Sequence, residues 1–164
     1  MKIIVDANIV FSGILNSKGK IGDLLINSKG YFNFIAPEFL RYEIKDKYER
    51  LQSISGLTIL QIMEAEYQVC KDITFITEEQ ISHKFWIEAH ELVHDIDIKD
   101  IQYVAYAKQF RCKIWSGDKK LSKGLISKDF VNIISTEDLY EIRSKRIIKY
   151  ERTKPKRNIP GPRS

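Results

Sequence analysis

The chain has 164 residues, of which 43% are hydrophobic and 30% are charged, as in an ordinary soluble globular domain. No apolar run is long enough to span a bilayer, and no secretory signal is expected because only three apolar residues separate Lys2 from Asp6. Cys70 and Cys112 lack the spacing of metal ligands, which favours reduced core residues and a cytoplasmic protein.

The net charge of +5 is unevenly distributed along the chain. Residues 143–164 contain nine Lys and Arg but one acid, Glu151, and so carry +8. The remaining 142 residues therefore carry −3, which excludes a uniformly basic surface for nucleic acid. We expect one domain at residues 1–148 and a basic tail at residues 149–164, disordered from Glu151 onward. The tail could act as an RNA clamp, a partner-binding arm or a solubilising end, and we favour the first two.

The first predicted element is a strand at Ile3–Val5. This short run of β-branched residues is typical of a strand that is buried on both faces of a parallel sheet. Asp6 and Asn8 follow at its carboxyl end, where ligands bind in open α/β sheets. An acid at this position can cap the next turn or hold a cation.

Three elements are predicted next. Apolar spacing at residues 21–25 predicts a helix that stops at Gly30, and residues 31–36 alternate as in a strand. Pro37 suits the first turn of a following helix, which we expect to end before Gly56. The apolar stripe of this helix is formed by Leu40, Ile44, Tyr48 and Leu51.

Capping-box patterns predict two further helices. Thr58 pairs with Gln61 ahead of the first helix, and Thr77 pairs with Gln80 ahead of the second. The run at residues 73–76 between them is too short to assign. The apolar positions of the two helices are Ile59, Ile62, Met63 and Tyr67 in the first, and Phe85, Ala89, Leu92 and Val93 in the second.

The last third of the chain repeats the alternation. Asp97 is expected to cap a helix that has Asp100 in its first turn. Strands are predicted at residues 113–116 and 131–134, and a last helix at residues 136–146. Alternating strands and helices predict a three-layer α/β/α sandwich with a central, mainly parallel sheet.

Four acids are expected to meet at one edge of the sheet if the strands that carry Asp6 and Asp118 are neighbours. Asp6 and Asp118 end strands, Asp100 opens a helix at the same edge, and Glu43 borders the apolar stripe of its helix. Converging carboxylates raise one another's pKa unless a cation neutralises them. Hard oxygen ligands suit Mg²⁺ or Mn²⁺, and such an ion can activate water for phosphodiester hydrolysis.

These motifs resemble those of the PIN-domain ribonucleases, most closely the small stand-alone prokaryotic members, many of which are toxins of toxin–antitoxin pairs. The resemblance covers about residues 1–142. It implies a PIN-like fold and a Mg²⁺- or Mn²⁺-dependent endoribonuclease that cleaves single-stranded RNA or RNA loops. It also implies a homodimer, with a protein antitoxin as a further partner. The motifs are Val5-Asp6-Ala7-Asn8, an acid in the helix after the second strand, Asp97-x-x-Asp100, and Ser116-Gly117-Asp118-x-x-Leu121.

The resemblance also assigns roles to individual acids. Asp6, Asp100 and Asp118 match the metal-site aspartates of the family. Glu43 matches the family's glutamate, although Glu38 competes for this role.

Polar and basic neighbours complete the predicted site. Asn8 and Ser116 match positions that hydrogen-bond the acids or their waters, while Asp97 is either a pure N-cap or an outer metal-site acid. The lysines that follow Asp118 form either a solvated face or a set of phosphate contacts, which would make RNA binding depend on salt. These lysines are Lys119, Lys120, Lys123 and Lys128.

Other functions remain open at this point. His90-Glu91-Leu92-Val93-His94 matches the H-E-x-x-H motif of zinc peptidases, but charged Glu88 and Asp95 flank it and argue against that function. The main alternative is a non-catalytic PIN-like module that binds RNA or protein. A phospho-acceptor domain would need paired acids after the first strand, and a structure-specific DNA nuclease would need a longer chain.

Overall fold

The computed structural model describes residues 1–154, which form a five-stranded sheet covered by helices. All neighbouring strands are parallel, in the order β3-β2-β1-β4-β5. The strands are β1 (Lys2–Val5), β2 (Asn33–Pro37), β3 (Ile73–Ile76), β4 (Lys113–Trp115) and β5 (Ile133–Ile134). The helices are α1 (Ala7–Leu15), α2 (Lys20–Asn27), α3 (Leu40–Asp46), α4 (Tyr48–Ser55), α5 (Ile59–Cys70), α6 (His83–Val93), α7 (Ile101–Phe110), α8 (Lys119–Ile126) and α9 (Thr136–Thr153), with short 3-10 turns η1 (Glu78–Gln80) and η2 (Ile98–Asp100).

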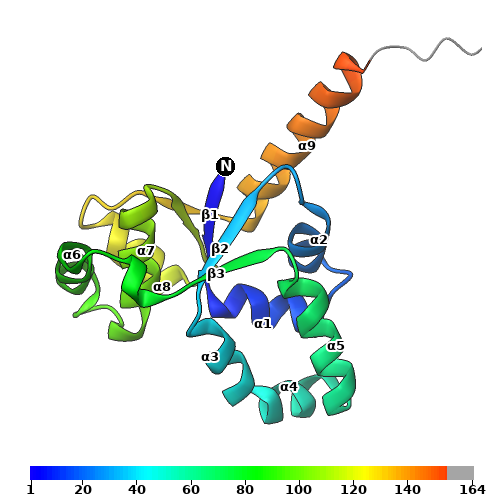
Figure 1. The fold of residues 1–164 in the computed structure, drawn as a ribbon, viewed down its shortest axis with the longest axis horizontal. Coiled ribbons are helices and arrows are strands. Elements are labelled where there is room, and N and C mark those ends of the chain that lie inside the picture. The colour runs from blue at the N-terminus through cyan, green and yellow to red at the C-terminus, as the bar shows by residue number, and fades with distance from the viewer. Residues whose placement is uncertain (155–164) are drawn as a thin grey trace, which may run out of the picture.

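The helices form a layer on each face of the sheet. Helix α7 packs against β1, β2 and β4, with α6 and α8 beside it, and α1, α2 and α5 pack together on the other side (Figure 1). The predicted three-layer α/β/α sandwich with a parallel sheet is therefore confirmed. Covering both faces explains why the central strand is a continuous apolar run, since Ile3, Ile4 and Val5 have no exposed surface.

The sequence gives no sign of α1, which begins directly after β1. Asp6 is its N-cap, and the Asp6 side chain accepts a hydrogen bond from the backbone N–H of Ile9. Ile9 and Val10 have low intrinsic helix propensity, but both are buried against the sheet. Tertiary burial therefore outweighs local preference here.

Three predicted helix starts and ends need correction. Pro37 closes β2 instead of opening a helix, and the helix predicted to run to Gly56 is divided at Lys47 into α3 and α4. Thr77 precedes η1 without a side-chain cap, and α6 begins only after Ser82. The Thr58–Gln61 capping box, in contrast, is formed at the start of α5 as predicted.

Helix α9 runs from the carboxyl ends of the strands to their amino ends and continues beyond them. At its start, Thr136 Oγ1 accepts a hydrogen bond of 3.0 Å from Trp115 Nε1 at the carboxyl edge. Further along, Arg146 donates to the carbonyl oxygen of Tyr31, just before β2 at the amino edge. The helix continues to Thr153 and projects beyond the sheet (Figure 1).

The tail prediction is therefore partly wrong. Residues 151–153 are helical instead of disordered, and the predicted boundary at residue 148 falls inside α9. Residues 155–164 lie outside the described part of the chain. Between residues 1 and 154, no helix combines the length and the apolar character that a membrane crossing requires.

Candidate functional site

Asp6 is a buried carboxylate at the carboxyl end of the central strand. Its residue surface is 3% exposed, and burial raises its pKa to about 6 against the opposing effect of hydrogen bonds from Ser116 and from the backbone of Ile9 and Asn8. The charge of Asp118 raises the pKa further. A carboxyl that is buried and close to another acid is costly to ionise unless a cation is present.

Asp118 reaches the same edge because β4 is the neighbour of β1. Val5 pairs with Trp115, so the residues that follow the two strands lie side by side. Asp118 is the N-cap of α8 and accepts hydrogen bonds from the backbone of Lys120 and Leu121. Its own N–H donates to Ser116 Oγ at 3.0 Å. Ser116 therefore lies between the two acids, and its supporting role in the site stays a prediction.

Asp97 and Asp100 approach from the loop ahead of α7. Asp97 is exposed and accepts a hydrogen bond from Lys99 N at 2.9 Å, so it caps η2. Asp100 is half-buried at the start of α7, and its carboxylate makes no capping bond. Asp97 therefore acts as an N-cap, one of the two roles left open by the sequence, whereas the carboxylate of Asp100 is left available for another role.

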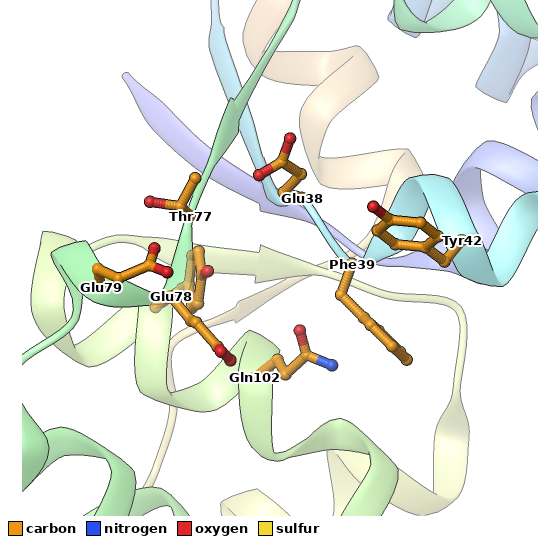
Figure 2. Close-up of a pocket in the computed structure, with 8 residues that line it drawn as sticks. Glu38, Phe39, Tyr42, Thr77, Glu78, Glu79 and Gln102 are labelled. Atoms are coloured by element: carbon orange, nitrogen blue, oxygen red, sulfur yellow. The ribbon is translucent and has the colours of Figure 1, made fainter.

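Glu43 and Glu38 lie at different places along the carboxyl edge of the sheet and differ in burial. Glu43 is half-buried in the first turn of α3, and its charge raises the pKa of Asp100. Glu38 is exposed at the end of β2 and lines a separate cavity with Thr77 and Glu78 (Figure 2). The geometry favours Glu43 over Glu38 as the site glutamate.

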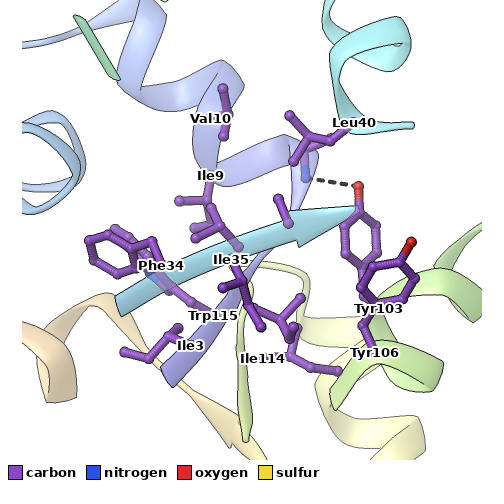
Figure 3. Packing of buried hydrophobic residues seen from close by; sticks show 14 of the residues in the cluster. Ile3, Ile9, Val10, Phe34, Ile35, Leu40, Tyr103, Tyr106, Ile114 and Trp115 are labelled. Atoms are coloured by element: carbon purple, nitrogen blue, oxygen red, sulfur yellow. Dashed lines mark hydrogen bonds between the residues drawn. The ribbon is translucent and has the colours of Figure 1, made fainter. Parts of the chain in front are cut away.

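Tyr103 is a part of this site that sequence reasoning missed. Its hydroxyl donates to Glu43 Oε2 at 2.6 Å and accepts a hydrogen bond from the backbone N–H of Ala7 at 3.2 Å (Figure 3). The buried ring thus fixes Glu43 against the turn that carries Asp6. A signal was available in the sequence, because Tyr103 lies one helical turn after Asp100.

Asp6, Glu43, Asp100 and Asp118 together form the acidic cluster. Burial and then the charges of Asp97, Asp6, Asp118 and Glu43 raise the pKa of Asp100 to about 7. All members of the acidic cluster therefore act electrostatically on one carboxyl, as expected for acids that share the carboxyl edge of a parallel sheet.

The donor chemistry of the acidic cluster fits a hard divalent cation, since every candidate atom is a carboxylate oxygen. The side chains are not gathered into a finished site, because no group of three or more His, Cys, Asp or Glu within residues 1–154 is arranged to hold a metal ion. Asp118 uses only its Oδ1 as a helix cap, which leaves Oδ2 for a ligand, whereas Asp6 also accepts hydrogen bonds from Ser116 and from the backbone of Asn8. The metal ligands Asp6, Asp100 and Asp118 thus stay a prediction.

The remaining predicted residues lie around the acidic cluster. Asn8 is exposed, and the contact that it makes with Asp6 comes from its backbone amide. Lys119, Lys120 and Lys123 are exposed on the first two turns of α8, next to Asp118. Lys128 belongs elsewhere, since its Nζ contacts Asp95 and the Leu92 carbonyl oxygen.

The H-E-x-x-H motif does not join this site. His90 and His94 are exposed at the end of α6, with stacked rings 5.6 Å apart. His94 Nδ1 lies 3.1 Å from the carbonyl oxygens of His90 and Glu91, so it donates to the backbone of its own helix. No third ligand group accompanies these histidines in the described residues, which argues against a zinc peptidase.

Comparison with known protein families agrees with this geometry. A family model described as PIN domain matches residues 4–151. The chain belongs to the PIN-domain family. The resemblance found in the acidic motifs is therefore confirmed, and it extends over nearly the whole described PIN domain. PIN domains are generally nucleases and typically use divalent metals. Among curated proteins, no match to this PIN domain was found.

Proposed function

We propose that this PIN domain is a divalent-metal-dependent endoribonuclease that hydrolyses phosphodiester bonds in single-stranded RNA or RNA loops. The observation that supports the proposal best is the acidic cluster, in which the charges of Asp6, Asp118 and Glu43 raise the pKa of Asp100, and that of Asp118 raises the pKa of Asp6. Such mutual repulsion is tolerated in a folded protein when a cation compensates for it.

The proposed ion is Mg²⁺ or Mn²⁺, held by Asp6, Asp100 and Asp118, with Asp97 as an outer acid. When bound, an ion of this kind lowers the pKa of water and stabilises charge on phosphate oxygens. Ser116 keeps Asp6 and Asp118 in place through hydrogen bonds to both residues.

Glu43 has the role of orienting the attacking water. Its Oε2 is held by the Tyr103 hydroxyl, which leaves Oε1 to accept a hydrogen bond from water. The water oxygen would bond to phosphorus as the bond to the leaving 3′-oxygen breaks, and the leaving oxygen would take a proton. The products are then a 5′-phosphate and a 3′-hydroxyl. Lys119, Lys120 and Lys123 on α8 would contact neighbouring phosphates.

The partners of the PIN domain are also proposals. We propose a homodimer in the cytoplasm whose nuclease activity is that of a toxin, with a protein antitoxin as its inhibitor. Growth arrest on induction, relieved by the product of a neighbouring gene, would support this role. Arrest that no neighbouring gene relieves would contradict it.

Purified protein tests the nuclease function directly. We expect single-stranded RNA to be cleaved in Mn²⁺ or Mg²⁺ but not in EDTA, with 5′-phosphate ends that a 5′-phosphate-dependent exonuclease then degrades. RNA binding that persists in EDTA, with no cleavage under any divalent ion, would instead support the alternative of a non-catalytic RNA-binding module.

Asp100→Asn is expected to stabilise the metal-free protein at alkaline pH. The pKa of Asp100 is raised from 3.8 to about 7, so the folded chain holds a proton that the unfolded chain releases. The free energy of unfolding therefore falls as pH rises through this interval. Asparagine has no charge to lose, so the melting temperature in EDTA should decline less between pH 4.5 and 8.5 than in the wild type.

The control for this measurement is Asp129→Asn. Asp129 is exposed after α8, with φ of +62°, a conformation that asparagine also adopts. It should follow the wild-type pH profile. Identical pH profiles of the melting temperature for Asp100→Asn and Asp129→Asn would show that the acidic cluster does not raise the pKa of Asp100.

A further inference from the structure

A cavity of about 220 Å³ lies beside the acidic cluster, at the carboxyl ends of β2 and β3. We call it the side pocket; its walls come from the residues after both strands and from α7. Figure 2 shows Glu38 and Phe39 after β2, Glu78 after β3, and Gln102 on α7 around it. The residues used below are Glu38, Phe39, Tyr42, Glu78, Gln102 and Tyr106.

Two aromatic side chains at the side pocket face solvent. Phe39 is 50% exposed and Tyr42 is 62% exposed, with ring centroids 6.3 Å apart and planes inclined by 43°. Both belong to the start of α3, whose other apolar side chains, Leu40 and Ile44, are buried. Exposed rings beside a nuclease site are suited to stack on unpaired bases, which present an aromatic face whatever their sequence.

The polar wall of the side pocket is negatively charged. This charge acts on the Tyr106 hydroxyl. Burial and then the carboxylates of Glu78, Glu79 and Glu38 raise the pKa of Tyr106 to about 12. The Tyr106 hydroxyl is itself fixed, since it donates to the Ile76 carbonyl oxygen at 2.9 Å. A negative wall repels a phosphate but accepts hydrogen bonds from the N–H groups of a base.

The side pocket connects to the acidic cluster through shared walls. Phe39 and Gln102 also line a second cavity, of about 420 Å³, whose wall includes Glu43. The backbone N–H of Glu43 donates to the Phe39 carbonyl oxygen at 3.1 Å, so the two residues are one helical turn apart. A base in the side pocket would therefore belong to a nucleotide close to the phosphate at the acidic cluster.

We propose that the side pocket binds one unpaired base of the RNA substrate, stacked on Phe39 and Tyr42 and read by Glu38, Glu78 and Gln102. The proposal rests on the nuclease function proposed above and adds a base preference to it. Guanine fits best, because its adjacent N1–H and N2–H groups can both donate to one carboxylate. Uracil fits worst, because two carbonyl oxygens flank its single N–H and would face the acids.

The test uses single-stranded oligouridine that carries one guanosine, adenosine or cytidine at a fixed position. Wild-type protein in Mn²⁺ should cleave the guanosine oligonucleotide at one position relative to the guanosine. Phe39→Ala and Tyr42→Ala should each raise KM for that oligonucleotide by about 5- to 100-fold, the range for loss of one stacking contact, with a smaller change in kcat. Glu78→Gln should reduce the preference for guanosine over uridine.

Tyr67→Ala is the matched control, since Tyr67 is 63% exposed on α5 and does not line the side pocket. It should cleave as the wild type does. Wild-type KM and site preference in Phe39→Ala and Tyr42→Ala would overturn the base pocket while leaving the nuclease function standing.

Binding measured without cleavage separates the two proposals. If no RNA is cleaved, the proposed nuclease function is wrong. Fluorescence anisotropy of the labelled guanosine oligonucleotide in EDTA then tests whether the side pocket binds a base. Weaker binding in Phe39→Ala than in Tyr67→Ala would still support it. Equal binding would overturn it and would leave the two rings as a surface for a protein partner.

Discussion

Asp6→Asn should abolish metal-dependent RNA cleavage and leave the fold intact. The expected loss is about a thousandfold, because a bound divalent ion stabilises the transition state by several kcal/mol and each 1.36 kcal/mol is a factor of ten. The fold should persist because the asparagine side-chain oxygen can still accept the hydrogen bond from Ile9 N that caps α1. Asparagine also removes a buried charge, so the melting temperature in EDTA should be unchanged or higher.

Cleavage rates in Mn²⁺ and thermal melts in EDTA on the same preparations check this prediction. Asp129→Asn, purified in parallel, should retain wild-type cleavage and so accounts for a contaminating nuclease. Full activity in Asp6→Asn would mean that the acidic cluster is not the site of hydrolysis. A large drop in melting temperature would mean that Asp6 serves mainly as a helix cap.

Arg143→Met should be the most destabilising change in α9. Arg143 is 6% exposed, and its guanidinium donates to the Asp23 carboxylate, the Asp23 carbonyl oxygen and Ser28 Oγ. Removing it leaves the Asp23 carboxylate with the hydrogen bond from Asn27 but without its cationic partner, and leaves Ser28 Oγ without the donor from Arg143, at an expected cost of about 3 kcal/mol. For a domain of this size, the melting temperature should fall by about 6–12 °C.

The dependence on pH identifies the partner of Arg143. Burial opposes ionisation of Asp23, but hydrogen bonds from Arg143 and Asn27 outweigh it and hold the pKa of Asp23 below 3.8. This ion pair therefore contributes stability above pH 4 and loses it as pH falls through the lowered pKa. The destabilisation by Arg143→Met should be smaller at pH 2.5 than at pH 7.

Lys145→Met is the control on the same helix. Lys145 is an exposed partner of Glu141, and such surface pairs contribute at most about 1 kcal/mol. Equal melting temperatures for the two variants would show that the hydrogen bonds of Arg143 to α2 contribute no more to stability than the exposed pair of Lys145 and Glu141.

The architecture and the acidic cluster were predictable because both follow from local patterns in the sequence. Buried strands read as apolar runs such as Ile3–Val5, and acids that follow parallel strands share one edge of the sheet. The order of elements predicted that Asp6 and Asp118 share this edge, and the pairing of β1 with β4, on which their proximity depends, comes from the structure.

The missed features depend on contacts between distant parts of the chain. Helix α1 contains several residues that prefer strands, such as Ile9 and Val10, and both are buried against the rest of the core. Tyr103 looks like a core aromatic in the sequence, and only the fold brings its hydroxyl to Glu43, 60 residues away. The length of α9 was underestimated because Pro, Lys, Arg and Gly dominate from Lys149 onward and apolar periodicity stops there, whereas the helix continues to Thr153.

The course of α9 has a practical consequence for work with this PIN domain. Lys2 opens β1 at the amino edge of the sheet, and α9 carries the chain past that same edge, so both ends of the described chain leave on the side away from the acids. A fluorophore, affinity handle or surface tether attached at Met1 should therefore lie away from the acidic cluster, at the opposite edge of the sheet. Single-molecule and immobilised assays of RNA cleavage can use attachment at this end.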